Sequence, residues 1–265
     1  MKTLLLTDLH GKDPSRLIRG VAEKEGIEAL AVLGDLDTPE VLQWIQESVN
    51  QYNLRFVYTP GNHEYNFVRN MGLSSTDMVT DIKVLRDGKL RPAFHTKSAT
   101  EYFSEWDAAP EQKQFVLDSS KRMRVDFPNL GLIVADHEIV YAHASLVDMD
   151  RIEKDAPDIM WGRLLRNKEK LKANFKAMGE INDFRLFFRG HDHIHSVRHS
   201  VDGDYVRYFD EIIGKYKINL EDTRSIVTVG AFVDGRYAIY DSEAQEIDFR
   251  RFKVKDRSKL QVFDF

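Results

Sequence analysis

The sequence has no cysteine among its 265 residues. This absence excludes disulfide bonds, thiolate metal sites and catalytic thiols. Any metal ion must therefore be held by oxygen and nitrogen atoms. Chains without cysteine are typical of reducing compartments, although a secreted protein can lack cysteine too.

Long hydrophobic segments are also absent. The longest apolar runs, residues 29–34 and 130–135, have six residues each, whereas a transmembrane helix needs about 18. Three leucines near the start imitate a signal peptide, but Asp8 interrupts them before the apolar stretch of about 7–15 residues that a signal peptide requires. We therefore expect a soluble, cytoplasmic protein with no membrane partner.

Glycine and proline are scarce, with 15 and 7 residues, which excludes a low-complexity or collagen-like chain. An excess of positive charge is absent as well, since 38 Lys and Arg face 43 Asp and Glu for a net charge of −5. Proteins that bind nucleic-acid phosphates are usually basic in at least one domain. The charge balance therefore argues against a nucleic-acid partner.

The N-terminal part alternates strand and helix signals. Apolar strands are predicted at residues 3–7, 28–33 and 54–58, and helix starts follow at Asp13 and Thr38, each of which precedes a proline. The strands are apolar on both faces, as in a parallel sheet that helices cover. This rhythm predicts an α/β fold.

Residues 65–130 are more polar and less regular, and no Pro/Gly/Ser-rich linker flanks them. We interpret them as an insertion at about 65–130 within a single domain that spans residues 1–265. A charged helix is predicted across 161–178. Further strands are predicted at residues 131–135, 138–142, 184–189, 196–200, 205–209, 225–229, 236–240 and 246–253.

Polar side chains follow the predicted strands where each strand ends. Asp8, Asp35 and Asn62 follow the first three strands at a spacing of 27 residues. Because ligands of parallel sheets bind at the carboxyl ends of the strands, these clusters should meet at one edge. Histidine and carboxylate are natural ligands of Mn, Fe, Co, Ni and Zn. The strand-end residues are Asp8, His10, Asp35, Asn62, His63, His143, His191 and His193.

As a set, the strand-end motifs resemble the calcineurin-like metallophosphoesterases, in their small bacterial and archaeal branch. The motifs occur in the family order, and Gly-Asn-His-Glu is the most specific of them. They are Asp8-Leu9-His10, Gly34-Asp35, Gly61-Asn62-His63-Glu64, Ala142-His143 and Gly190-His191-Asp192-His193. The resemblance implies a four-layer αββα sandwich, with two mixed β-sheets flanked by helices, in agreement with the strand and helix pattern.

The resemblance also implies a dinuclear metal centre and a phosphoesterase reaction. A metal-bridging hydroxide would attack phosphorus, and His63 would stabilise the transition state or protonate the leaving oxygen. Manganese is the expected ion, with Fe, Ni, Co, Zn or Mg as alternatives. The implied ligands are Asp8, His10 and His193 for the first ion, Asn62, His143 and His191 for the second, and Asp35 for both.

One position departs from the family pattern. Many members carry an acidic residue three positions after the bridging aspartate, near the histidine that corresponds to His63. Here that position is Thr38, and the acid is Asp37. Asp37 either orients His63 or only precedes a helix that Thr38 caps. His195 continues the alternation of His191 and His193, and we expect a partly exposed strand position for it.

The expected substrate is a small soluble phosphoester, such as a nucleotide, a cyclic nucleotide or a dinucleoside polyphosphate. The sequence does not separate phosphodiesterase from phosphatase, but the family associates a histidine at the position of His10 with diesters. Two alternatives remain: a nuclease of the same superfamily, and a noncatalytic scaffold on the same fold. A scaffold would be expected to lack ligand or catalytic positions, and all eight are filled here.

Overall fold

The structure is a computed structural model. It describes residues 1–64, 83–86, 89–92, 133–136, 138–146, 162–165, 167–201, 205–221 and 223–254. Of the predicted insertion at 65–130, the described residues form two short strands. They are β4 (Lys83–Arg86) and β5 (Lys89–Pro92), which pair in antiparallel fashion.

The first sheet is built from the N-terminal strand–helix repeat and the C-terminal strands. Its order is β11-β14-β13-β1-β2-β3. The three N-terminal strands run parallel, as predicted, while β13 pairs with β1 in antiparallel fashion. The bounds are β1 (Lys2–Leu6), β2 (Ala29–Val32), β3 (Arg55–Tyr58), β11 (Gly214–Lys217), β13 (Arg236–Asp241) and β14 (Glu246–Arg251).

The second sheet has the order β10-β9-β12-β8-β7-β6. Strands β7, β8 and β12 run parallel, and the outer strands join them in antiparallel fashion. Both sheets are therefore mixed. The bounds are β6 (Ile133–Asp136), β7 (Ile139–Ala142), β8 (Leu186–Arg189), β9 (Ser196–Val201), β10 (Tyr205–Asp210) and β12 (Arg224–Thr228).

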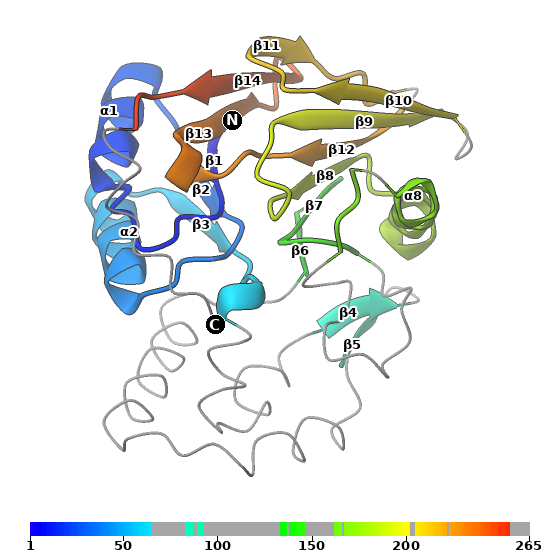
Figure 1. Ribbon diagram of the computed structural model, residues 1–265, viewed down its shortest axis with the longest axis horizontal. Coiled ribbons are helices and arrows are strands. Elements are labelled where there is room, and N and C mark those ends of the chain that lie inside the picture. The colour runs from blue at the N-terminus through cyan, green and yellow to red at the C-terminus, as the bar shows by residue number, and fades with distance from the viewer. Residues whose placement is uncertain are drawn as a thin grey trace.

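Helices cover the outer faces of both sheets. Figure 1 shows α1 (Ser15–Glu25) and α2 (Pro39–Tyr52) on one side and α8 (Lys168–Asn182) on the other. Buried side chains from both sheets, such as Leu5, Phe188 and Phe249, share one core cluster between the sheets. The four-layer αββα sandwich is thus confirmed. None of the helices in the described ranges combines the length and the apolarity needed to cross a bilayer.

Two sequence-based expectations differ from the structure. The helix predicted across 161–178 begins only at Lys168, because the Asn167 side chain accepts a hydrogen bond from the Lys170 amide and sets the N-terminus there. His195 is fully buried, not partly exposed. Its ring packs at 4.9 Å from the ring of Phe249 in the first sheet, which covers it.

Candidate metal centre

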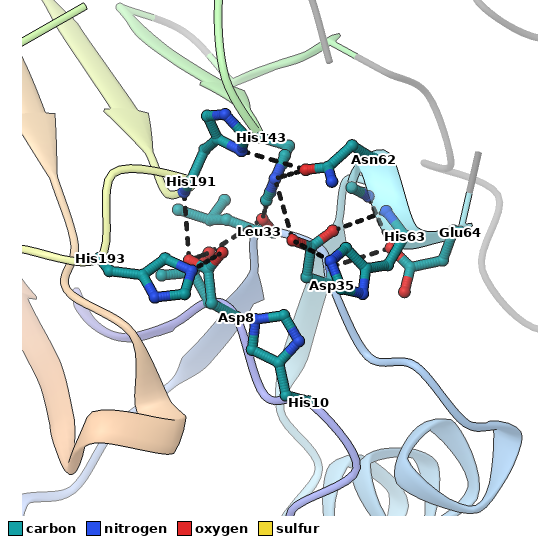
Figure 2. A network of polar contacts seen from close by, with 12 residues as sticks. Asp8, His10, Leu33, Asp35, Asn62, His63, Glu64, His143, His191 and His193 are labelled. Atoms are coloured by element: carbon teal, nitrogen blue, oxygen red, sulfur yellow. Dashed lines mark hydrogen bonds and ion pairs between the residues drawn. The ribbon is translucent and has the colours of Figure 1, made fainter. Parts of the chain in front are cut away.

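Five loops bring the predicted site residues to one edge of the two sheets. The loops after β1, β2 and β3 come from the first sheet, and those after β7 and β8 come from the second. Figure 2 shows that the side chains gather around a common centre. The residues brought together are Asp8, His10, Asp35, Asn62, His63, His143, His191 and His193.

Asp8, His10 and His193 form one group that could hold a cation, since one atom of each lies within 4.8 Å of the others. Asp8 Oδ2 accepts hydrogen bonds from the Thr7 hydroxyl at 2.7 Å and the His191 amide at 3.1 Å. These two bonds fix the fully buried Asp8 carboxylate. They leave Asp8 Oδ1 facing His193 Nε2 at 3.3 Å.

Asp35, His143 and His191 form a second such group. His143 Nδ1 donates to the Leu33 carbonyl at 2.6 Å, so a neutral His143 carries its lone pair on Nε2. This Nε2 lies 3.0 Å from Asn62 Oδ1 and 3.5 Å from Asp35 Oδ2, and His191 Nδ1 also lies 3.0 Å from Asn62 Oδ1. In this tautomer the lone pair of His143 Nε2 faces the Asn62 and Asp35 oxygens, an arrangement that a cation between them would stabilise.

Asp37 contacts two histidines of the site. Its Oδ2 lies 2.9 Å from His10 Nδ1, and its Oδ1 lies 2.6 Å from His63 Nδ1. Asp37 contacts His63 and also precedes α2, so the two roles that the sequence left open for Asp37 do not exclude each other. With Nδ1 engaged, His63 Nε2 lies 3.9 Å from Asp35 Oδ2. His10, Asp35 and His63 meet the same distance limit as the other two groups.

Glu64 is a structural member of the site that sequence reasoning passed over. Its buried carboxylate accepts hydrogen bonds from the amides of Gly61, Asp35 and Leu36 at 2.6, 2.9 and 2.5 Å. These bonds join the loops after β2 and β3. A Cβ atom on Gly61 would overlap with Asp35 Oδ1, so glycine is required for this approach. The signal in the sequence was the position of Glu64 in the Gly-Asn-His-Glu motif.

The loop backbone takes an unusual conformation at six non-glycine positions. Left-handed φ values cost roughly 1–3 kcal/mol each for such residues and persist where the surroundings enforce them. In three loops they alternate, so that residues i and i+2 share the conformation. The residues are Asp8 (51°), His10 (46°), Asp35 (56°), Asp37 (68°), His191 (67°) and His193 (59°).

Burial and neighbouring charges set the protonation of the site. Burial opposes ionisation of Asp37, but its contacts with His10 and His63 outweigh burial and lower its pKa to about 2. Burial likewise opposes the charge on His63, yet Asp37 raises the pKa of His63 to about 9. Burial and the nearby His143 lower the pKa of His191 to about 2. His191 is thus neutral, the form in which an imidazole binds a cation.

The ligand set fits divalent metal ions. Among the described residues, the buried atoms His10 Nε2 and Asp8 Oδ1 make no hydrogen bond, although buried polar atoms are nearly always paired. Asp8 Oδ1 contacts His193 through the ion pair described above. Both unbonded atoms belong to the same candidate group. Imidazole nitrogen with carboxylate oxygen and no thiolate suits first-row divalent ions. Coordination would supply the missing partners of both atoms.

Comparison with known proteins identifies the family of this chain. The profile of the calcineurin-like phosphoesterase family matches residues 1–195. A metallophosphoesterase from Sphaerobacter thermophilus has a similar solved structure, with a TM-score of 0.53 and 18% identity over 96% of this chain and 90% of that one. The solved structure of TT1561 from Thermus thermophilus has a TM-score of 0.42 and 11% identity, over 94% of this chain and 98% of that one. A search of curated proteins returns no match.

The family match covers more than half of the chain, from β1 through β8, and the strands from β9 onward follow it. It contains every residue of the two candidate groups. The chain therefore belongs to the calcineurin-like phosphoesterase family and is a metal-dependent hydrolase of phosphoesters.

Proposed function

We propose that this protein hydrolyses a small soluble phosphoester at a centre of two divalent cations. The observation that carries the proposal is the meeting of two adjacent groups of nitrogen and oxygen ligands from both sheets (Figure 2). Asp8, His10 and His193 hold one cation in this proposal. Asn62, His143 and His191 hold the other. Asp35 serves both, since it lies in one group with His143 and His191 and in another with His10.

Bound there, two divalent cations would lower the pKa of a coordinated water and would neutralise the charge of a phosphate group. The remaining work falls to the side chains of the chain itself. Asp37 holds His63 through Nδ1, so the other ring nitrogen is available to the substrate. The His63 side chain is 43% exposed, while Asp35 beside it is 3% exposed. His63 thus combines access to a substrate with a fixed orientation, as a general acid requires.

The substrate proposal extends to the class of ester. We expect phosphodiesters to be preferred over monoesters, because His10 is in place and turned by Asp37 toward the site. A nucleotide, cyclic nucleotide or dinucleoside polyphosphate meets this description. The net charge of −5 supports a small substrate over a nucleic acid. Manganese is the ion that we expect to give the highest turnover.

A panel of phosphoesters tests the proposal. Metal-free protein would be resupplied with Mn, Fe, Co, Ni, Zn or Mg singly and assayed with bis-p-nitrophenyl phosphate, p-nitrophenyl phosphate, cyclic nucleotides, dinucleoside polyphosphates and DNA. We expect turnover of small esters only with metal, and faster turnover of the diester. The exposed Glu47 on α2 provides a control, since Glu47→Gln should match the unsubstituted protein. Ester hydrolysis that survives metal removal would contradict the proposal.

A further inference from the structure

Arg189 is a fully buried charge at the end of β8. The three residues before it in this strand, Leu186, Phe187 and Phe188, are apolar and equally buried. Replacement of a buried ion pair by apolar residues is often neutral or even stabilising. Core stability therefore does not by itself account for an arginine at this position.

The guanidinium of Arg189 donates hydrogen bonds to four residues. Its Nε donates to the Ala144 carbonyl, and one Nη donates to the Asp192 carboxylate and, at 3.2 Å, to the Thr228 hydroxyl. The other Nη donates to the Gly162 carbonyl at 2.9 Å. The flat fork of a guanidinium can make such bonds at the same time, whereas the ammonium of a lysine cannot reproduce their geometry.

Two of the four partners of Arg189 adjoin three of the proposed metal ligands. Ala144 follows His143, and Asp192 lies between His191 and His193. The Asp192 side chain is only 4% exposed. The two histidines on either side of it both have left-handed φ values, 67° and 59°. The bond from Arg189 to Asp192 thus holds the residue in the middle of a strained loop.

We propose that Arg189 is a positioning residue, which fixes the loops after β7 and β8 relative to each other so that His143 and His191 can share one cation. This inference rests on the proposed function. It predicts that loss of Arg189 weakens the Asp35–His143–His191 group more than the Asp8–His10–His193 group, because only the former needs both loops.

The chain offers a matched control in Arg198 on β9, which is also buried and pairs with a carboxylate, Asp210, at 2.5 Å. Its other hydrogen bonds include those to the carbonyls of Val197 and Phe209. Arg198→Lys perturbs a buried arginine of the same sheet whose named partners lie on β9 and β10. It separates a general loss of stability from an effect on the metal centre.

The experiment is a Co²⁺ titration of metal-free protein, followed by the visible absorption of the bound ion and by the number of ions per chain. For Arg189→Lys we expect about 10–100-fold weaker binding of one ion and a changed spectrum for that ion. Asp192→Asn should cause a change of the same kind. The double variant should lose less than the sum of the two single losses, because the two side chains act through one contact.

Normal affinity and an unchanged spectrum for a folded Arg189→Lys would overturn the inference. An equal loss of affinity in Arg198→Lys would overturn it as well. If Arg189→Lys does not fold, Asp192→Asn decides in the same way, since an unchanged spectrum there contradicts the proposed contact. Failure of the unsubstituted protein to bind Co²⁺ would contradict the proposed function itself. The titration of the unsubstituted protein thus separates that outcome from a failure of the Arg189 inference, which concerns only the variants.

Discussion

At the scale of single residues, Asp37 shows how one side chain can organise two others. Each of its oxygens contacts a different imidazole, His10 on one side and His63 on the other. A carboxylate can accept from both rings at once, whereas an amide cannot. The acid therefore links a proposed metal ligand to the proposed general acid.

Asp37→Asn is expected to lower turnover about 10–100-fold, a typical effect of losing a partner of a metal-binding or catalytic histidine. The NH₂ group of an asparagine cannot accept a hydrogen bond, so His10 or His63 loses its partner. Steady-state kinetics at saturating metal measure the change. Thr38→Ala is the control, because Thr38 makes no side-chain cap hydrogen bond to α2. Full turnover of Asp37→Asn would mean that Asp37 only precedes the helix.

His63→Gln should retain both ions and lose about 10²–10⁴-fold in turnover, the usual contribution of a positioned acid. The loss should be smaller for a p-nitrophenolate leaving group, which needs little protonation, than for an alkyl or ribose leaving group. Metal content and rates for both classes of ester check this expectation. Loss of metal together with activity would instead make His63 a ligand, as the His10–Asp35–His63 group permits.

At the scale of elements, the loops are fixed by contacts with one another. Glu64 collects amides from the loops after β2 and β3, and the Gly190 amide donates to the His143 carbonyl at 2.9 Å between the loops after β7 and β8. The loop after β1 joins that after β2 through the bond from the His10 amide to the Asp35 carbonyl at 3.0 Å. Loops held in this way can place ligands within a fraction of an ångström.

Glu64→Gln tests this account of the loops. The glutamine has one carbonyl oxygen, while its NH₂ group faces backbone N–H groups that need an acceptor, so at least one buried amide loses its bond. Each such loss costs about 1–3 kcal/mol. We expect a lower melting temperature together with weaker metal binding, measured by thermal denaturation with and without Mn²⁺. A variant with normal stability and normal metal affinity would show that Glu64 does not hold the loops.

Local patterns in the sequence predicted most of the elements and predicted which eight residues lie together at one edge of the sheets. In the N-terminal part, each apolar strand is followed by a polar residue. This repeat correctly predicted that Asp8, Asp35 and Asn62 lie at one edge of a parallel sheet. Strand β11 was missed, because its side chains alternate between half-buried and exposed and include two lysines. The pairing of β1 with β13 was missed too, since it joins segments more than 230 residues apart.

Contacts between distant segments account for what the sequence did not predict. Arg189 has no distinguishing local pattern, and the roles of Arg189, Glu64 and His195 depend on which loop or sheet lies against them. Arg189 looks like the end of an apolar strand until Asp192 and Ala144 are placed beside it. The role of Asp37 was left open for the same reason, because only the folded chain brings His63 to it.

At the scale of the whole molecule, the candidate ligands come from both sheets of the sandwich (Figure 1). Asp8, His10, Asp35 and Asn62 follow strands of the first sheet, and His143, His191 and His193 follow strands of the second. A bound cation would therefore link the two sheets, and its binding energy would add to the stability of the folded state.

Metal removal should thus lower the melting temperature. A site at 100 times its Kd contributes about 2.7 kcal/mol, and each kcal/mol shifts the melting temperature of a chain of this size by roughly 2–4 °C. We expect a chelator to lower the melting temperature by about 5–10 °C per site and Mn²⁺ to restore it, as followed by differential scanning calorimetry. An identical melting temperature with and without metal would contradict the link between the sheets.

In the proposed centre, two cations share Asp35. The number of metal ions per chain in Asp35→Ala, determined by elemental analysis after equilibration with Mn²⁺, tests this sharing. Asp35 is the carboxylate common to both halves of the proposed centre, and its oxygens lie beside His143 and the His63 amide. We predict two ions in the unsubstituted protein, fewer than one in Asp35→Ala, and no turnover in that variant. Two tightly bound ions with full turnover in Asp35→Ala would contradict the account.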